Sequence, residues 1–294
     1  MKSFEENLNR FAAIPQWNQI VEIIAEVPPL SKTVQEALDL LQQPEVDLKK
    51  LSEILEKDVG LSSKILKVAN SPLFARPREI TSVLSATSIM GLKTLRALIV
   101  SASLKESILL DSQYLKFSWY KGLAVSRALR MACEKLATDF SDELTTIGIL
   151  HVLGDLVLGS HPAIKASLNE AYAYAFENKD DLTFLIEDRI GFKPSLVSAM
   201  LLKKWSFPEE VCLINLHRET PLEMLDWPLK PLKKLALFQA TCWLFEKNFF
   251  NLTEKSLASR FCESVKKAQL FNLELLEQQV FEALTAIDLD RSDF

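Results

Sequence analysis

The sequence predicts an all-α protein, and three observations support this fold class. The chain of 294 residues contains only seven glycines, whereas leucine, alanine, glutamate and lysine, which favour helices, are abundant. Apolar residues recur at spacings of three and four positions through nearly the whole chain, as on one face of a helix. No segment alternates apolar and polar residues as a half-buried strand would, and there is no glycine-rich phosphate-binding loop.

The first third of the chain predicts short helices separated by proline, glycine or capping residues. The carboxylate of Asp47 can accept a hydrogen bond from a free backbone N–H, so it marks a helix start. The expected helices are the segment Val34–Leu41, closed by Pro44; Leu48–Leu55 behind Asp47; Leu61–Asn70, ending before Ser71-Pro72; a helix from a cap at Thr81 or Ser82 to Met90; and, beyond Gly91, a helix containing Leu95–Ala102.

The rest of the chain keeps the same period. Pro208 suits the first position of a helix, where its missing N–H costs nothing, and Glu209 and Glu210 then face the positive end of the helix dipole. The expected helices are Trp119–Ala137, Asp142–Leu158, Pro162–Asn178, Leu182–Ile190, Ser195–Trp205, the helix starting at Pro208, Leu235–Lys247, Glu254–Ala268 and Leu273–Ile287.

Composition and charge exclude several classes of protein. The formal net charge of −5 repels a phosphate backbone on average, so we expect no nucleic-acid partner. The segment Met1–Arg10 has no apolar core and is not a secretory signal, and the apolar runs at 97–104 and 235–245 are too short to span a membrane. We therefore expect a soluble, cytoplasmic protein without a membrane partner.

The four cysteines, Cys133, Cys212, Cys242 and Cys262, lie tens of residues apart and show no metal or redox spacing. Buried free thiols are the better interpretation.

The segment Gly148–Asp155 is the most informative one for chemistry. His151 lies on an apolar helix and is followed by a glycine, Gly154, which is the frame of a metal-phosphohydrolase motif. Val152, however, stands where that motif needs a carboxylate, and a valine has no lone pair to offer a divalent metal.

At this point the chain resembles the HDOD domain, the HD-related output domain of bacteria, over roughly residues 14 to 218. The resemblance rests on the order and spacing of the matching segments as well as on their residues. The matching segments are Pro28-Pro29-Leu30, Leu55-Glu56-Lys57-Asp58, Lys64–Ser71, Ile80-Thr81-Ser82, Met90-Gly91-Leu92, Gly148–Gly154, Trp205-Ser206-Phe207-Pro208 and His217.

The resemblance implies an all-helical, HD-like bundle that acts as a signalling or regulatory module, usually without phosphohydrolase activity. An active HD site needs several histidines and aspartates to hold a metal that generates hydroxide. By resemblance, those positions hold other residues here: Lys121 for the first histidine, Val152 for the aspartate, Pro194 for a later histidine, Ser198 for a glycine, Arg218 for the second of two paired histidines after His217, and Thr241 for the distant aspartate. His151 alone remains, and one imidazole does not make a metal site.

Other catalytic arrangements are weaker. Asp155 and Glu187 could form an acid–base pair, but solvated helix carboxylates are the commoner case. Ser160 is adjacent to His161, and neighbours in sequence rarely face one substrate. Nothing in the spacing of Cys133 or Cys212 brings either thiol close to His217, so a thiol–imidazole pair would depend on the fold. His217 itself either binds an anion or closes a helix.

DNA binding has one point in its favour. Leu51–Leu66 has helix-turn-helix spacing with Asp58-Val59-Gly60 as the turn, and Lys64 and Lys67 could contact phosphates. The stronger interpretation is that the same residues form core helices. The loop Ala75-Arg76-Pro77-Arg78 is the better candidate for an anion or partner contact.

The sequence therefore predicts an all-α, HD-like bundle with an N-terminal helical part at 14–113, a degenerate HD-like part at 114–220, and extra C-terminal helices at 221–294. The aromatic residues of this last part should pack on the HD-like part, or else form a groove for a partner or a dimer contact.

We expect a non-catalytic regulator with no catalytic, metal or cofactor-binding residues and no cofactor. It would bind a protein partner or a small ligand, with a homodimer as one form. The alternatives are a residual metal-dependent phosphohydrolase acting on a nucleotide or phosphomonoester and, third, a DNA-binding regulator.

Overall fold

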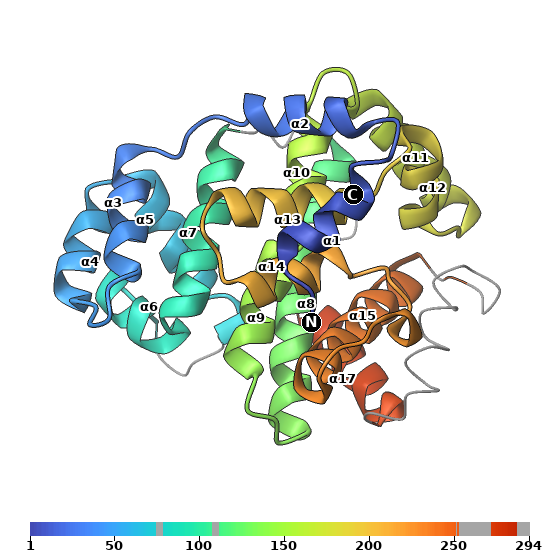
Figure 1. Ribbon diagram of the computed structural model, residues 1–294. Helices are drawn as coiled ribbons and strands as arrows, with labels where there is room; N and C mark the ends of the chain where they lie inside the picture. Colours follow the sequence, from blue (N-terminus) through green and yellow to red (C-terminus); the bar gives the residue numbers. More distant parts are fainter. Residues whose placement is uncertain (75–78, 108–111, 251, 253–271, 287–294) are drawn as a thin grey trace.

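The computed structural model describes residues 1–74, 79–107, 112–250, 252 and 272–286 (Figure 1), and all regular structure in these ranges is helical, as predicted. The first helices in chain order are α1 (Phe4–Phe11), α2 (Trp17–Glu26), α3 (Lys32–Leu41), α4 (Leu48–Glu56), α5 (Val59–Ala69), the 3₁₀ turn η1 (Pro72–Phe74), α6 (Val83–Met90), α7 (Leu92–Ser107) and α8 (Gln113–Lys135).

The remaining elements are α9 (Ser141–Leu150), α10 (Leu153–Ser160), α11 (Lys165–Asn178), α12 (Leu182–Ile190), α13 (Pro194–Lys204), α14 (Glu209–Leu216), the turn η2 (Leu222–Met224), α15 (Leu229–Phe250) and α17 (Leu273–Ala286). The predicted helix Glu254–Ala268, the loop Ala75–Arg78, Cys262 and Ile287 lie outside the described residues.

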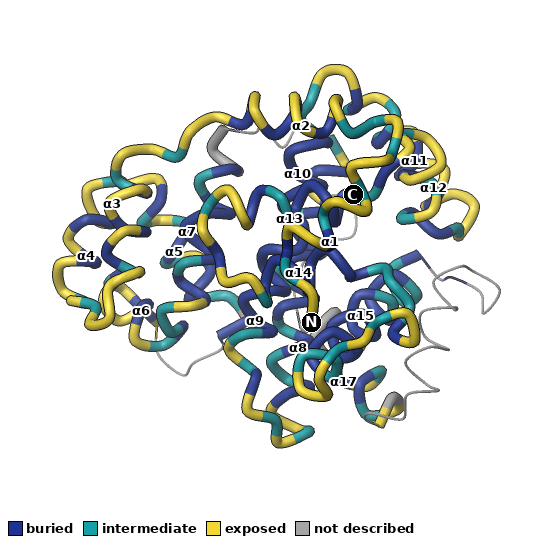
Figure 2. The backbone as a smooth tube through the Cα atoms, viewed as in Figure 1, coloured by how far each residue is buried: buried dark blue, intermediate teal, exposed yellow. Residues whose placement is uncertain are grey.

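Helices α3 to α6 form one end of the molecule, and α7 connects this end to a central group of α8, α9, α10, α13 and α14 (Figure 1). In the central group α8 packs against α9 and α10, and α13 packs against α10 and α14. Helices α15 and α17 also lie against α8. Figure 2 shows that the backbone of this central group is almost continuously buried, so any site built there is shielded from water.

The capping residues that the sequence indicated begin their helices as predicted. Asp47 Oδ1 accepts from the backbone N–H groups of Lys49 and Lys50 at 3.0 Å, and the hydroxyl of Ser82 accepts from the N–H of Ser85 at 3.2 Å. Asp58 also caps a helix, with its carboxylate 2.9 Å from the N–H of Leu61. The predicted turn at Asp58-Val59-Gly60 is therefore wrong, because the capped helix α5 already includes Val59 and Gly60.

Asn70, in the segment that resembled the HDOD domain, joins two parts of the N-terminal end. Its amide N–H donates to the carbonyl of Ile80 at 2.8 Å and to that of Leu66 at 2.9 Å, and its Oδ1 accepts from the N–H of Ile80 at 2.7 Å. The side chain thus pairs both backbone groups of Ile80 with the end of α5.

Replacing Asn70 with alanine should lower the free energy of unfolding by about 1–3 kcal/mol, because both backbone groups of Ile80 lose their partner. Asn178 is a matched control, since its amide donates only to the Tyr174 carbonyl of its own helix. Urea unfolding should show a change within about 0.5 kcal/mol for Asn178→Ala. Equal losses in the two variants would contradict this role of Asn70.

Of the residues described, the segment Ser141–Ser160 has the length and apolar composition of a membrane span, and α6 with α7 would qualify only as a pair bent by 119°. In the structure 89% of the first segment is buried. Its apolar character is thus accounted for by its place in the core.

Candidate functional site

The predicted helix Asp142–Leu158 is interrupted at His151 and Val152, and the interruption creates the centre of the site. The hydroxyl of Ser198, on α13, donates to the His151 carbonyl at 2.9 Å and accepts from the N–H of Gly154 at 2.8 Å. These bonds replace two that a continuous helix would have made. The prediction of one helix was wrong because its interruption depends on a residue of another helix.

The imidazole of His151 is completely buried. Its Nδ1–H donates to the carbonyl of Gly148 at 2.7 Å, and its ring meets the ring of Phe238 edge-on with centroids 5.5 Å apart. Burial lowers the pKa of His151 well below its usual value, and the cations of Arg218 and Lys121 lower it further. His151 is therefore neutral, and among the described residues its Nε2 has no hydrogen-bond partner.

Lys121, which the resemblance placed at a metal-ligand position, lies beside this centre as a buried cation. Its ammonium donates to the carboxylate of Glu246, on α15, and both side chains are buried. Burial, the largest single effect, opposes the charge, but Glu246, Asp155 and Cys242 together outweigh it and the pKa of Lys121 is raised.

Arg218, at another of those positions, is the second buried cation. Its guanidinium donates to the carboxylate of Glu219 and, through Nη1, to the His151 carbonyl at 3.0 Å. Glu219 also accepts from the Ser195 hydroxyl at 2.5 Å. Burial is the largest single effect and would raise the pKa of Glu219, but Arg218, Lys193 and the Ser195 hydrogen bond together lower it, so the pair is ionised.

Asp155 corrects an expectation of the sequence analysis, because its carboxylate is buried and not solvated. Its Oδ1 accepts from the hydroxyl of Tyr114 at 2.9 Å. Burial raises the pKa of Asp155, partly offset by Arg218 and Lys121. Glu187, its suggested acid–base partner, is exposed on α12 and lies 3.5 Å from Lys193.

His217 faces away from this centre. It ends α14, with Nε2 donating to the side-chain oxygen of Asn7 at 3.1 Å and Nδ1 3.1 Å from the Thr220 hydroxyl. Trp227 covers the ring edge-on at a centroid distance of 5.3 Å. Of the two interpretations of His217, closing a helix is therefore the correct one.

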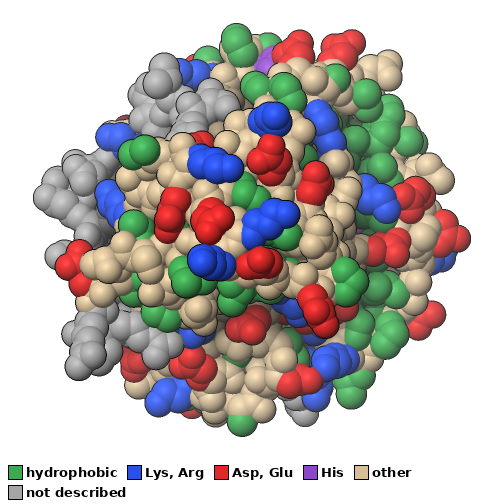
Figure 3. All heavy atoms as spheres, turned by 90° about the vertical axis from the view of Figure 1, so that its left-hand side faces the viewer, with side chains coloured by type: hydrophobic (Ala, Val, Ile, Leu, Met, Phe, Trp, Pro, Cys, Tyr) green, Lys and Arg blue, Asp and Glu red, His purple; other side chains and the backbone are tan. Residues whose placement is uncertain are grey.

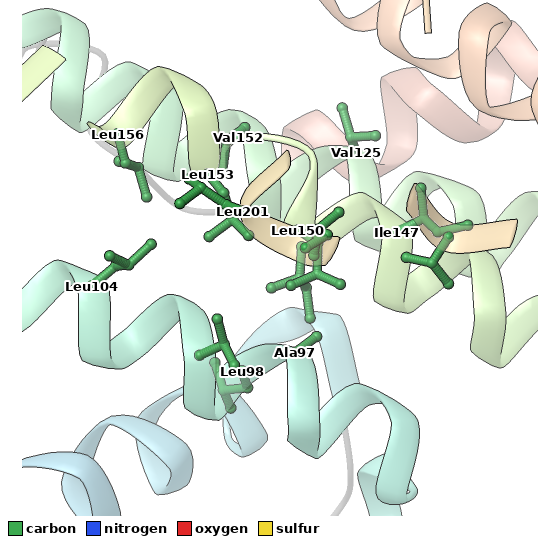
Figure 4. Close-up of a cluster of buried hydrophobic side chains, with 14 of the residues drawn as sticks. Ala97, Leu98, Leu104, Val125, Ile147, Leu150, Val152, Leu153, Leu156 and Leu201 are labelled. Atoms are coloured by element: carbon green, nitrogen blue, oxygen red, sulfur yellow. The ribbon is translucent and has the colours of Figure 1, made fainter. Parts of the chain in front are cut away.

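The remaining family positions contribute no metal ligand. Val152 belongs to the buried apolar core, which Figure 4 draws together with Leu153 and Leu201. Thr241 is buried and donates to the carbonyl of Leu237 at 2.7 Å. Pro194 begins α13.

This set of side chains does not fit a divalent metal. His151, whose Nε2 is free, lies near two buried cations, and these would repel a further positive charge there. In the described part of the chain, no three histidine, cysteine, aspartate or glutamate side chains lie close enough to share an ion.

A small hollow of about 40 Å³ opens beside this centre. Its polar lining includes both buried ion pairs, and α15 adds Gln239 and Trp243. Gln239 donates to the carbonyls of His217 and Thr220, at 3.0 and 2.7 Å. Most of these polar groups are therefore already engaged within the chain.

The other sequence candidates have structural roles. Ser160 donates to the Val157 carbonyl at 2.8 Å, while His161 ends α10 and lies 3.2 Å from Glu26. Helix α11 starts at Lys165, three residues later than the predicted start at Pro162. Three cysteines are buried free thiols as predicted, and burial raises their pKa values, to about 11 for Cys133 and about 12 for Cys212 and Cys242.

The helix suggested for DNA recognition, α5, buries Leu61, Ile65 and Val68 and packs against α4, α6 and α7. Figure 3 shows the face of the molecule on the α3–α6 side, where acidic and basic side chains are interspersed. Such a mixed surface offers phosphates no uniform positive field.

The comparison with protein families decides the family. The model of the HDOD domain matches residues 27–221, well over half of the chain. The chain belongs to the HDOD family. The buried ion pairs of Lys121 and Arg218 are thus features of an HDOD protein.

Several known proteins are similar to this HDOD chain. An uncharacterized protein of Treponema pallidum (strain Nichols) is 24% identical over 205 residues, which are 69% of this chain; the chain spans only 39% of that relative's length. The structure of an HDOD domain protein of unknown function from Geobacter sulfurreducens matches with a TM-score of 0.62 and 20% identity, covering 89% of this chain and 91% of that one.

Two further structures share the fold. A candidate signal transduction protein of Marinobacter aquaeolei VT8 matches with a TM-score of 0.64 and 19% identity, over 90% of this chain and 58% of that one. A candidate phosphohydrolase of Shewanella amazonensis SB2B matches with a TM-score of 0.58 and 20% identity, over 89% and 97%.

Sequence reasoning missed three residues of the centre, Tyr114, Glu219 and Glu246, and it missed the burial of Asp155. Glu246 carried a signal, since it is a carboxylate that directly follows the apolar run Trp243-Leu244-Phe245. Glu219 directly follows Arg218, so a local pair could have been suspected. Nothing in the sequence around Tyr114 indicates its contact with Asp155.

The free energy of unfolding should depend on pH through His217. Burial, aided by Arg10, lowers the pKa of His217 to about 4 in the folded chain, below the usual 6.5. Between these two pKa values the unfolded chain binds more protons than the folded chain. The contribution of His217 to the free energy of unfolding is therefore fully present above pH 6.5. It falls as the pH drops toward 4, by up to about 1.4 kcal/mol per pH unit. Urea titrations should show a shallower fall in the variant His217→Gln. If the free energy of unfolding fell equally steeply with pH in the wild type and in His217→Gln, His217 would not be the group responsible.

Proposed function

We propose that this chain is a regulatory HDOD protein that acts in the cytoplasm by binding a protein partner and catalyses no reaction. The observation that supports this function best is the pair of buried cations, Lys121 and Arg218, each bound to a carboxylate beside His151. The name of the Marinobacter structure, which refers to signal transduction, points in the same direction.

The chemical argument concerns charge. Metal-dependent hydrolysis of phosphate esters requires a divalent cation to produce hydroxide near neutral pH. Here Lys121 and Arg218 supply positive charge at family ligand positions, and Glu246 and Glu219 neutralise it. A metal entering the centre would have to break these pairs and leave buried charges without partners, which is strongly unfavourable.

The ion pairs instead connect helices. Lys121 and Glu246 join α8 to α15, and Arg218 and Ser198 hold the interruption between α9 and α10. A centre of this kind stabilises the arrangement of five helices, and so keeps the outer surfaces of the bundle in position for a partner.

Metal content and hydrolysis test the proposal together. The protein, purified after incubation with Mn²⁺, Fe²⁺ or Zn²⁺ and then desalted, should retain far less than one metal ion per chain. It should hydrolyse neither p-nitrophenyl phosphate nor bis-p-nitrophenyl phosphate above the buffer rate. The variant His151→Ala should give the same results.

Stoichiometric metal with hydrolysis, both lost in His151→Ala and both kept in the control His161→Ala, would overturn the proposal. Those results would establish a metal-dependent phosphohydrolase. His161 is a suitable control because it lies near the surface beside Glu26, at the far end of α10.

A further inference from the structure

The first helix of the chain covers a surface of the HDOD domain. Helix α1 precedes the HDOD match, which begins at residue 27, and packs on α14 within that match. Figure 1 shows α1 lying across α13 and α14. An isolated helix of this length is unstable in water, so α1 is helical because it is docked.

Two residues of α1 anchor it. The ring of Phe4 is 1% exposed and its backbone N–H donates to the carboxylate of Glu209 at 2.6 Å. Asn7, one turn later, is 4% exposed. Leu8 and Phe11 continue the same face and pack partly buried against the core.

The contact between Asn7 and His217 is specific. The amide nitrogen of Asn7 donates to the carbonyls of Lys2 and Ser3 at 3.1 and 2.8 Å, which turns its oxygen toward His217. His217 donates to that oxygen through Nε2. This surface therefore holds both an amide oxygen and a phenyl ring, which α1 supplies through Asn7 and Phe4.

The rim of the contact is charged and open to water. Lys203, on α13, lies 2.9 Å from the carboxylate of Glu5, with both side chains substantially exposed, and 5.6 Å above the ring of Phe4. Exposed pairs of this kind contribute little to stability but favour acidic partners. Phe4 and Asn7 are thus the fully buried anchors of α1, and Leu8 and Phe11 add only partly buried contacts.

We propose that the surface formed by Lys203, Glu209 and His217 is the docking site for an amphipathic helix of a partner protein, and that α1 is its internal competitor. The partner helix would carry a phenylalanine, an asparagine three residues later and acidic residues in its first turn, as α1 does with Phe4, Asn7, Glu5 and Glu6. This inference rests on the proposed function, in which the chain acts by binding a protein.

A peptide of residues 1–12 serves as the probe. In the full-length chain, the double variant Phe4→Ala/Asn7→Ala removes both anchors of α1 and should free the site. Fluorescence anisotropy should then show at least about tenfold tighter binding of the labelled wild-type peptide to this variant than to the wild-type chain. A peptide carrying Phe4→Ala should bind at least about tenfold more weakly. The chain with Asn9→Ala, on the exposed face of α1, should behave as the wild type.

Amide hydrogen exchange provides the second measurement. In the double variant, exchange should accelerate in α1 and at the end of α14 and remain unchanged in α8 and α9. Acceleration in all four helices would show that α1 is part of the cooperative core and would overturn the proposal. A folded double variant that does not bind the peptide would also overturn the proposal. So would a dimer of the wild-type chain, detected by sedimentation, that the double substitution abolishes. The surface would then be the interface with a second copy of the chain.

These outcomes are independent of the metal and hydrolysis measurements. A chain that proves to be a phosphohydrolase would refute the proposed function whatever the peptide does. A failed peptide experiment in a metal-free, inactive chain would refute only this docking site.

Discussion

Replacing Glu246 with leucine should lower the free energy of unfolding by about 3–5 kcal/mol, because Lys121 would remain buried as a cation without a partner. The loss would come from the stranded charge and not from the missing contact alone. For a chain of marginal stability, this is a large fraction of the total. Chemical denaturation followed by circular dichroism measures the effect directly.

The double variant Lys121→Met/Glu246→Leu separates these causes. With both charges gone, most of the lost stability should return, since apolar residues of similar volume often replace a buried ion pair without cost. Lys247, the neighbour of Glu246 on α15, and Glu277 on α17 offer a surface pair as control, 2.7 Å apart and partly exposed. Glu277→Leu should cost less than about 1 kcal/mol. A double variant as unstable as Glu246→Leu would refute the charge argument.

The second large effect should come from Gly154→Ala. A Cβ at position 154 would lie 2.0 Å from the carbonyl oxygen of Pro194 and 2.9 Å from the backbone nitrogen of Ser198. Because both are backbone atoms of α13, the helices α10 and α13 would have to separate. We expect a loss of about 3 kcal/mol or more, at the upper end of the range for overpacking.

Gly60→Ala is the control for this substitution, since Gly60 is helical and exposed in α5. Alanine at an exposed helical position should stabilise the chain by about 0.5–1 kcal/mol relative to glycine. If Gly154→Ala were also neutral or stabilising, the close approach of α10 and α13 would be wrong. The expected loss means that the glycine of the phosphohydrolase-like motif is required here for packing.

Local signals in the sequence were sufficient for most helices. Asp47 and Ser82 cap helices through bonds to residues two or three positions away, so neighbours in sequence reveal them. Gly91 ends α6 with a positive φ of 76°, as a glycine between two helical patterns suggests. The spacing of apolar residues then indicated which faces are buried.

Helices α1 and α2 were not predicted, and α1 shows why. Its buried face consists of Phe4, Asn7, Leu8 and Phe11, which has helical spacing, but the polar Asn7 interrupts the apolar pattern. Asn7 can be buried because His217, 210 positions away, donates a hydrogen bond to its side-chain oxygen. A pattern of apolar residues cannot register a partner at that distance in sequence.

The sequence by itself determined the helical class, the HDOD resemblance, and which residue types stand at positions 121, 152 and 218, because each depends on single positions or on their near neighbours. Only the tertiary structure decided that the two cations are neutralised by Glu246 and Glu219, that Asp155 is buried, and that Ser198 interrupts the helix at His151. The physical reason is that burial and charge pairing depend on which helices meet, and helices meet through residues far apart in the chain.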